Sequence, residues 1–503
     1  MEGKGRGLGR AVRRGVALGL TGAALWCMSW AADLTGWLGR AKAAGEEPAV
    51  AVALLSSQLE GGARTDKLSG WGRLLLEQSA LLRAGVGSAA EPPAPEEQPE
   101  HIVDASGMVL MPGLVNCHTH LPLSLLRGYG DELAQDEWLR RSVFPRQARM
   151  DARSVRAAAL LGIAQCLRFG VTSVSEMYFF SDAEAEAVAE SGIKANLCHP
   201  VTTELTDGFD FDADPDCLEA AALHERWHGF DNGRIKIDCA IHSYDTSTHP
   251  AWEAVSGYAL ENGLGMQLHL SETAAAEEDC LDRTGLTQAQ LLDCHRLFAA
   301  PAAAAHCCHL SEEDMRLLAR RGVSAVHCPR SELRLGMGRA DVLAMVKAGM
   351  NVCLGTESAA ASGSLDVFSE MRTAALMAKA AAGRVDALPP EAALMMATVC
   401  GARAQGRAAE CGMIKTGMDA DLILLDFNQP HLIPCHNMLT DLVYTVCGQD
   451  VALTMVRGKV LYAAGKYASI DLDAVMQELR DYAIPTIFSD AKADGPDTEE
   501  DAQ

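Results

Sequence analysis

Two histidines near the start of the chain have the spacing of a metal-binding pair. His118 and His120 follow a largely apolar run over residues 108–115. A Pro-Gly pair interrupts the run, so the strand itself is predicted to start at Leu114. Alternate side chains of a strand point to one face, so both imidazoles are expected to project together as half of a site for a divalent ion. Two unrelated surface histidines are the alternative, which later histidines after apolar runs disfavour.

Four further polar residues follow apolar, strand-like runs. His269 lies near the end of the run 265–270, and Glu272 comes shortly after it. His306 closes a second run, and Glu357 follows a third at 351–356. Each residue alone would be an ordinary surface or hydrogen-bonded residue. Together with the two histidines, they predict a metal-hydrolase site.

The segment between residues 113 and 411 is predicted to position these side chains as a barrel. Strand-like runs are found at 171–174, 195–198, 235–241, 265–270, 303–306, 323–327 and 351–355. Helical stretches such as 151–169 and 311–321 fall between them. Repeated β-α units over ~250–300 residues predict a (β/α)8 barrel of the α/β class, whose chemistry lies at the C-terminal ends of the strands.

Shorter strands and turns flank the predicted barrel. Residues 48–112 and 412–488 are expected to form one small composite β-sandwich domain, with candidate strands at 49–55, 73–76, 421–426 and 451–456. Residues 489–503 form an acidic tail.

Residues 1–47 are predicted to be an N-terminal extension. Basic residues precede an apolar run at 16–30, as in a secretory signal, and Arg13-Arg14 would suit a twin-arginine export route. An exported or membrane-tethered protein would follow from that interpretation. The alternative, held nearly level, is a start assigned too far upstream, with the extension not native.

Composition limits the compartment and the partners. The net charge of −24 argues against a nucleic-acid surface, which needs a basic patch. The 16 cysteines are scattered without paired spacing. Buried free thiols in a reducing compartment are therefore expected, which favours a cytoplasmic protein. His306-Cys-Cys-His309 looks like a zinc knot, but neighbouring residues of a strand face opposite ways, so one of the four is expected at any site.

Seven stretches of the chain resemble the amidohydrolase superfamily, in the branch of methylthioadenosine/S-adenosylhomocysteine deaminases and triazine chlorohydrolases. The resemblance runs from about residue 48 to about 480, with the motifs in order and at family-like separations. The matching stretches are Pro-Gly-Leu-Val-Asn-Cys-His-Thr-His at 112–120, Leu-Leu-Arg-Gly at 125–128, Leu-His-Leu-Ser-Glu-Thr at 268–273, Ala-His-Cys-Cys-His-Leu at 305–310, His-Cys-Pro at 327–329, Leu-Gly-Thr at 354–356 and Pro-His-Leu-Ile-Pro-Cys-His at 430–436.

By this resemblance the barrel holds one divalent ion: zinc, with iron or manganese as alternatives. His118, His120 and His269 are the implied ligands. His306 is implied to polarise a water molecule, and Glu272 to carry a proton to a ring nitrogen of the substrate. Independently of the family, a divalent ion lowers the pKa of water to ~7, and attack on an amidine-like ring carbon needs a proton donor for the ring nitrogen.

Two positions depart from the family pattern. Glu357 stands where the family has an aspartate that binds metal and acts as a base, and its extra methylene moves the carboxylate by ~1.5 Å unless the backbone shifts. Gln147 stands where the adenosine-type deaminases have a glutamate for the ribose hydroxyls; it keeps hydrogen bonding without the charge.

Three more residues are implied to bind substrate. His242 resembles the family's substrate-binding histidine, and Trp138 its stacking position, with packing in the core as the alternative. Arg234 is proposed to contact a carboxylate tail, with an ordinary surface arginine as an equal alternative.

The leading hypothesis from the sequence is a metal-dependent hydrolytic deaminase of an adenosine-like thioether nucleoside, of the 5'-methylthioadenosine or S-adenosylhomocysteine type. A hydrolase of another aminated or halogenated heterocycle, such as a triazine, guanine or cytosine, is the second hypothesis. The third is a catalytically impaired homologue that binds ligand, because Glu357 replaces the aspartate. The family also implies a homo-oligomer.

Overall fold

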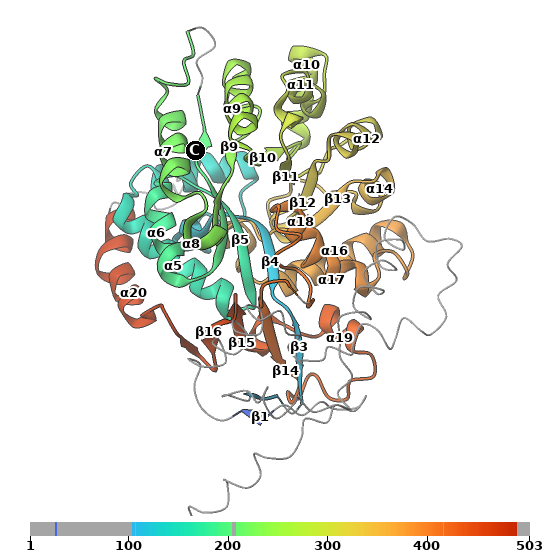
Figure 1. The fold of residues 1–503 in the computed structure, drawn as a ribbon. Coiled ribbons are helices and arrows are strands. Elements are labelled where there is room, and N and C mark those ends of the chain that lie inside the picture. Colours follow the sequence, from blue (N-terminus) through green and yellow to red (C-terminus); the bar gives the residue numbers. More distant parts are fainter. Residues whose placement is uncertain (1–25, 28–102, 106, 204–207, 416, 490–503) are drawn as a thin grey trace, which may run out of the picture.

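The computed structural model describes residues 26–27, 103–105, 107–203, 208–415 and 417–489. In this part of the chain, eight runs of parallel strand surround a common axis (Figure 1). In chain order they are β4 (Leu114–Thr119), β5 (Val171–Met177), β6 with β7 (Lys194–Cys198 and Pro200–Val201), β8 with β9 (Ile235–Ile237 and Cys239–Ile241), β10 (Met266–Leu270), β11 (Ala302–His306), β12 (Ser324–His327) and β13 (Asn351–Leu354).

The first and last of these strands meet and close the barrel. A parallel bridge joins Thr119 to Glu357. Before it, the Asn116 side chain donates to Thr356 Oγ1 at 2.7 Å and accepts from the Thr356 backbone N–H at 2.9 Å. The predicted (β/α)8 barrel is confirmed, and β4 starts at Leu114 as the Pro-Gly pair indicated.

The barrel strands are buried on both faces, which explains their sequence pattern. Every residue of β4, β5, β6 and β10 is buried. Helices cover the outside of a parallel sheet, so its strands read as nearly continuous apolar runs rather than alternating ones. Polar residues also lie inside these buried strands, as Thr172, Ser173 and Ser175 of β5 do.

Side-chain caps fix where the outer helices begin. Asp151 Oδ1 accepts from the Ser154 backbone N–H at 2.8 Å, and Ser154 Oγ accepts from the Asp151 N–H at 2.9 Å, which starts α5 (Ala152–Arg168). Ser311 starts α12 (Glu312–Arg321) in the same way. The longer of the other outer helices are α6 (Ser181–Ser191), α7 (Pro215–Trp227), α9 (His249–Asn262), α10 (Ala274–Thr284) and α16 (Val367–Ala382).

A five-stranded antiparallel sheet lies below the barrel. It pairs β3 (Met108–Pro112), which precedes the barrel, with β14 (Leu422–Asp426), which follows it, and continues through β15 (Val451–Val456), β16 (Lys459–Ala463) and β17 (Lys466–Tyr467). The two flanks of the barrel therefore meet in one sheet. The candidate strands at 49–55 and 73–76 lie outside the described residues, and the domain boundaries remain predictions.

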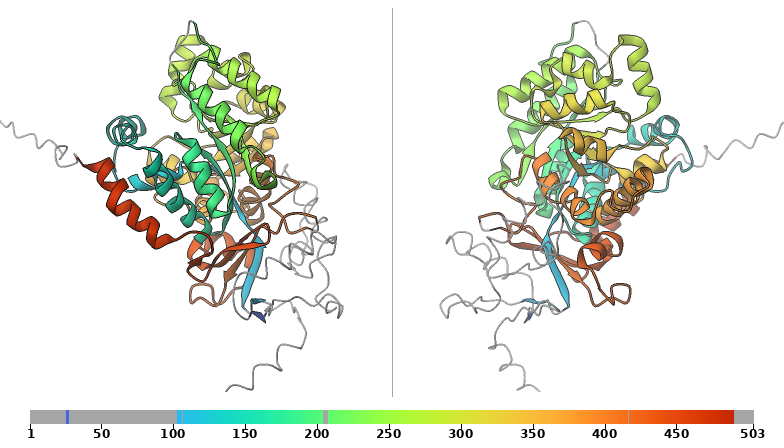
Figure 2. Two further views of the ribbon diagram at one scale, coloured as in Figure 1. Left: turned by 60° about the vertical axis from the view of Figure 1, so that its left-hand side comes forward. Right: turned by 90° about the vertical axis from the view of Figure 1, so that its right-hand side faces the viewer.

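Helices also occur after residue 412, where the sequence interpretation expected short strands. They include α19 (Met438–Tyr444), α20 (Leu472–Glu478), η8 (Leu479–Ala483) and α21 (Ile484–Phe488). Val475, Leu479, Ala483 and Ile487 recur every four residues and are all buried. That spacing gives one helical face, which packs on α5 (Figure 2).

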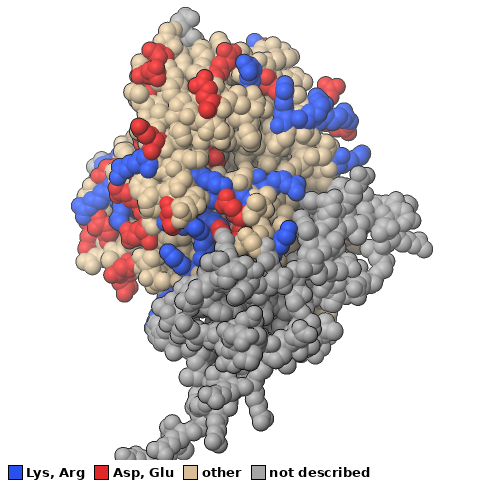
Figure 3. Space-filling model, in the orientation of Figure 1, with Lys and Arg blue, Asp and Glu red and all other residues tan. Residues whose placement is uncertain are grey.

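Of the N-terminal extension, the structure describes only β1 (Trp26–Cys27), which pairs antiparallel with β2 (Val103–Asp104). Among the described helices, none combines the length and the apolar character that a membrane span requires. The cysteines with described side chains are free thiols, most of them buried. On the face in Figure 3, basic and acidic side chains are interspersed.

Candidate metal centre and active site

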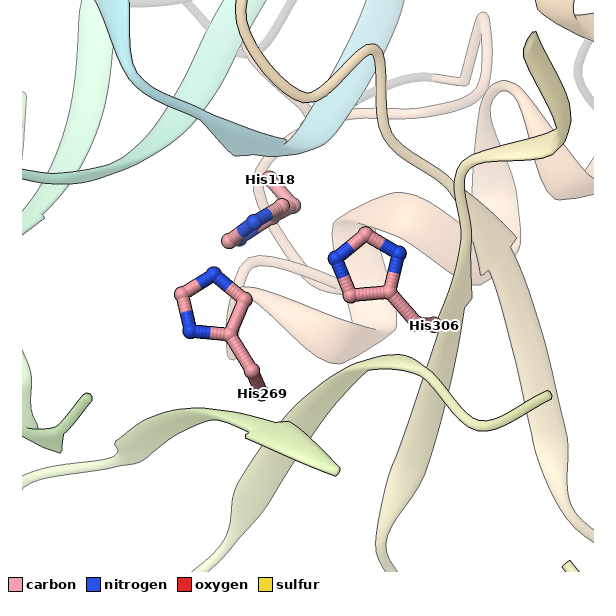
Figure 4. A group of neighbouring side chains, drawn as sticks. All are labelled: His118, His269 and His306. Carbon is pink, nitrogen blue, oxygen red and sulfur yellow. The ribbon is translucent and has the colours of Figure 1, made fainter. Parts of the chain in front are cut away.

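Three strand ends bring a group of imidazoles together at the C-terminal end of the barrel. His118 lies on β4, His269 on β10 and His306 at the end of β11 (Figure 4). One nitrogen from each ring lies within 4.8 Å of the others. His120, two residues after His118 on the same side of the strand end, joins them, with its Nε2 3.4 Å from Nε2 of His269.

Backbone carbonyls orient two of these rings. Nδ1 of His120 lies 2.6 Å from the Met177 carbonyl oxygen, and Nδ1 of His269 lies 2.7 Å from that of His242. A neutral imidazole that donates from Nδ1 keeps its lone pair on Nε2. In both residues that lone pair is directed into the cluster, which is the tautomer a metal ligand requires.

The chemistry of the imidazole cluster suits a divalent ion. Nε2 of His118 is buried and has no hydrogen-bond partner among the described residues. Burial, with repulsion from the neighbouring imidazoles, lowers the pKa of His118 and of His269 well below the usual value. Neutral imidazoles with converging lone pairs, one of them unsatisfied, are the donor set of a zinc-like ion.

Glu357 completes the cluster with a carboxylate. Its backbone N–H donates to the His118 carbonyl at 3.0 Å, and its Oε1 lies 3.6 Å from Nε2 of His120. The backbone is left-handed here, with φ of 56°, and Oε2 accepts from the N–H of Ser358. Burial raises the pKa of Glu357, while His120 and Ser358 oppose that shift. The longer side chain thus reaches the cluster by folding back.

Glu272 stands beside His306 at the opening of the cluster. Its Oε1 lies 3.3 Å from Nε2 of His306, and the side chain of Gln135 hydrogen-bonds it. Burial, followed by the charges of Glu357 and Asp245, raises the pKa of Glu272 to about 8. Burial lowers the pKa of His306 to about 4. At neutral pH the pair is therefore a carboxylic acid beside a neutral imidazole.

A cavity of about 550 Å³ opens onto these groups. His120, His269, Glu272 and Glu357 line its inner part. Of the predicted substrate-binding residues, Trp138, Gln147 and His242 also line it. The indole N–H of Trp138 donates to the Tyr129 carbonyl at 3.1 Å, and the residue is buried while it lines the cavity.

The chain is similar to known proteins along most of its length. The sequence model of the amidohydrolase family matches residues 109–461. A 5-methylthioadenosine/S-adenosylhomocysteine deaminase of Moorella thermoacetica is 38% identical over 76% of this chain and 88% of its own length. A 5'-deoxyadenosine deaminase of Methanosarcina mazei is 37% identical over 81% of this chain and 91% of its own. The chain belongs to the amidohydrolase family.

Solved structures give the same fold for this amidohydrolase. An adenosine deaminase from Xanthomonas campestris with bound zinc has a TM-score of 0.71 and 33% identity, covering 76% of this chain and 86% of that one. An atrazine chlorohydrolase from Arthrobacter aurescens complexed with zinc has a TM-score of 0.70 at 22% identity, covering 76% and 90% of the two chains. The second likeness concerns the fold alone.

Arg234 is not part of the amidohydrolase cavity, so its predicted contact with a substrate carboxylate is wrong. It immediately precedes β8 at the N-terminal end of the strand, away from the histidine cluster. Its Nε donates to Asp231 at 2.6 Å, and its Nη1 donates to the carbonyls of Val188 and Ile193 at 3.0 and 2.8 Å. A buried guanidinium whose donors are taken by a carboxylate and carbonyls holds α6 and β6 in place.

Two buried glutamates that the sequence interpretation missed support the cluster. Glu176, at the end of β5, accepts from the Leu121 N–H at 2.8 Å and from the Thr119 hydroxyl, on both sides of His120. Burial raises its pKa to about 7. An acid inside an otherwise buried strand was the available signal.

The second is Glu332 on α13 (Pro329–Arg334). Its Oε2 lies 2.9 Å from Nδ1 of His327, and its Oε1 lies 3.9 Å from Nδ1 of His306. Burial would raise the pKa of Glu332, but the two histidines hold it below its usual value. The proline that starts the helix after the predicted strand 323–327 was the signal, because a helix beginning there turns its first residues back toward the strand end.

Proposed function

We propose that this amidohydrolase is a hydrolytic deaminase of adenosine nucleosides modified at the 5' position, of the 5'-methylthioadenosine and S-adenosylhomocysteine type, and that its ion is zinc. The observation that carries the proposal is the position of Glu272, whose carboxylic acid lines the cavity beside the imidazole cluster. Relatives at 37–38% identity are named for deamination of such nucleosides, and the solved adenosine deaminase with bound zinc supports the ion.

We assign His118, His120, His269 and Glu357 as the residues that hold the ion. When bound, it would act as a Lewis acid that lowers the pKa of water to ~7. Three neutral imidazoles leave the charge of a dication uncompensated, and the Glu357 carboxylate restores part of that balance. His306, an uncharged ring that lies between Glu272 and Glu332, would hydrogen-bond the attacking water.

The reaction needs several proton transfers, and two carboxyl groups of the chain can make them. Glu357 would accept the proton of the attacking water, and Glu272 would donate a proton to the ring nitrogen next to the carbon that carries the amino group. The water oxygen bonds to that carbon, Glu357 would pass its proton to the amino nitrogen, the C–N bond breaks and ammonia leaves, and the proton of the remaining hydroxyl would return to Glu272. The purine is converted to its oxo form, and no oxidant or reductant is required.

The rest of the nucleoside would lie along the outer cavity. Trp138 offers an aromatic face, His242 a ring nitrogen, and Gln147 an amide for the ribose hydroxyls. Nδ1 of His242 lies 3.2 Å from Thr246 Oγ1, which leaves Nε2 for a ligand. Burial lowers the pKa of His242 to about 4, so it would bind as a neutral group.

Ammonia release from purified protein tests the proposal. The panel contains 5'-methylthioadenosine, 5'-deoxyadenosine, adenosine, guanine, cytosine and a chlorotriazine. Turnover of the adenosine nucleosides alone supports the proposed function. Turnover of only a base or the triazine would favour the second hypothesis of the sequence analysis, and inactivity of the metal-loaded protein on every substrate would favour an impaired homologue.

A further inference from the structure

Carboxyl groups, and no basic side chains other than histidines, line the described part of the active-site cavity. In the described part of the chain the carboxyl groups are those of Asp245, Glu272 and Glu357, and neither lysine nor arginine contributes to the lining. The rest of the outer wall is largely apolar, with Leu123, Leu139, Val143, Phe144, Met177, Phe179, Leu335 and Met337. A ligand's negative charge would therefore meet no counter-ion among these residues.

Arginines close to the cavity are engaged elsewhere. Arg140 donates from Nε to the Asp136 carbonyl at 3.1 Å, and Arg141 pairs with Glu137 at 2.8 Å. Arg146 donates to the Tyr129 hydroxyl at 2.8 Å.

Two others are fixed in the same way. Arg149 donates to Ser489 Oγ at 2.7 Å, and Arg334 pairs with Asp131 at 2.8 Å. The segment 135–150 thus supplies apolar and amide groups to the cavity while its cations point to other partners.

The strand opposite that segment leads into an acidic stretch. β7 contributes Pro200 to the cavity wall, and Thr202 follows it. Residues 195–225 of the sequence contain no lysine or arginine, whereas aspartates and glutamates recur throughout. Of these, Asp216 accepts a hydrogen bond from the Thr202 backbone N–H at 2.7 Å. In the sequence, the stretch that follows the cavity-lining Thr202 therefore adds acids and no cation as far as residue 225.

We propose that the cavity selects adenosine nucleosides whose 5' substituent carries no carboxylate, and so prefers 5'-methylthioadenosine, 5'-deoxyadenosine or an amine-bearing tail to S-adenosylhomocysteine. This inference rests on the deaminase function proposed above. A carboxylate brought into the outer cavity, away from the ion proposed at its inner end, loses water, meets no lysine or arginine among the described lining residues and faces Asp245, whereas an ammonium group can approach Asp245. An apolar thioether or methyl group fits the wall without either cost.

A matched pair of nucleosides separates charge from size. S-adenosylhomocysteine and its decarboxylated analogue, 5'-(3-aminopropyl)thioadenosine, have the same thioether chain and ammonium group and differ in the carboxylate. We expect kcat/KM for S-adenosylhomocysteine to be at least 10-fold lower than for the analogue and for 5'-methylthioadenosine. Equal values for the pair would overturn the inference while leaving the deaminase function in place.

A cation introduced at the rim should reverse the preference. Phe144 lines the cavity and is 43% exposed, so an arginine there has room and solvent for its charge. Phe144→Arg should raise the ratio of kcat/KM for S-adenosylhomocysteine to that for the analogue by at least 10-fold over Phe144→Gln, the control for loss of the ring. A ratio equal in both variants would contradict a selection by charge.

Binding measurements keep the inference testable without turnover. Calorimetry with metal-loaded Glu272→Gln protein should give weaker binding of S-adenosylhomocysteine than of its decarboxylated analogue. If the wild-type enzyme deaminates no adenosine nucleoside, the proposed function falls, and this binding difference still decides the charge preference. Equal affinities would overturn it.

Discussion

Oε1 of Glu272 lies 3.3 Å from Nε2 of His306, although Glu272 follows β10 and His306 ends β11. The environment shifts their pKa values in opposite directions, to about 8 for the carboxyl group and about 4 for the imidazole. Both groups are consequently uncharged at pH 7, and the carboxyl group has a proton to give. A surface pair would instead be a carboxylate beside a partly protonated histidine.

Replacement of Glu272 by glutamine should lower kcat by ~10²–10⁴, because the amide keeps the shape but has no acidic proton. Metal content, measured by elemental analysis, should stay at the wild-type level, since Glu272 is outside the proposed ligand set. Glu278→Gln is the matched control: it is an exposed glutamate on the following helix and should leave kcat unchanged. Unchanged turnover in Glu272→Gln would remove this residue from the mechanism.

The raised pKa of Glu272 predicts that activity falls on the alkaline limb of the pH profile. Its pKa is raised, so the proton-donating form is present below about pH 8 and is lost as the pH rises through that value. We expect kcat to fall above about pH 8 in the wild-type enzyme. Glu272→Gln should lack that limb in its residual activity. A profile that is the same in both proteins would assign the limb to another group.

Removal of metal should abolish activity reversibly. The imidazole cluster predicts about one divalent ion per chain. A chelator should therefore remove activity, and zinc should restore it. His118→Ala should lose the ion, whereas His309→Ala should retain it, because Nε2 of His309 bonds the Met337 carbonyl outside the cluster. Activity that survives complete removal of metal would contradict the assigned site.

A buried ion pair between the barrel and the small sheet should contribute strongly to stability. Nζ of Lys194 lies 2.5 Å from Asp421 and 2.8 Å from Asp419, and the Lys194 side chain is 1% exposed. Lys194→Met leaves the buried Asp421 carboxylate without its cation, which should cost ~3–5 kcal/mol.

Lys236→Met is the control for that variant. Lys236 forms a more exposed pair with Glu410, so its loss should cost ~1 kcal/mol or less. Urea unfolding of both variants followed by circular dichroism gives the comparison. Equal shifts of the two midpoints would show that burial does not strengthen the effect of Lys194.

The strand ends were predictable from the sequence, and contacts between distant segments were not. Apolar runs ending in His120, His269 and Glu357 predict both the barrel and its functional edge, because parallel strands place their carboxyl ends together. Arg234 was assigned wrongly because the sequence alone does not show at which end of its strand an arginine lies. The structure places it at the N-terminal end, away from the functional edge of the barrel. Glu332 was missed because it lies on a helix and one of its partners, His306, comes from another strand end.

The last prediction concerns Glu357, which follows β13 and whose Oε1 lies 3.6 Å from Nε2 of His120. Glu357→Ala should lower kcat by ~10²–10⁴ and weaken metal binding, because it removes both the base and the charge that balances the ion. Glu357→Asp keeps the carboxylate and should stay active. Kinetics on 5'-methylthioadenosine with parallel metal analysis measures both effects. If wild type is inactive on every amine substrate and Glu357→Asp gains activity, the native protein is an impaired homologue, and the glutamate is the cause.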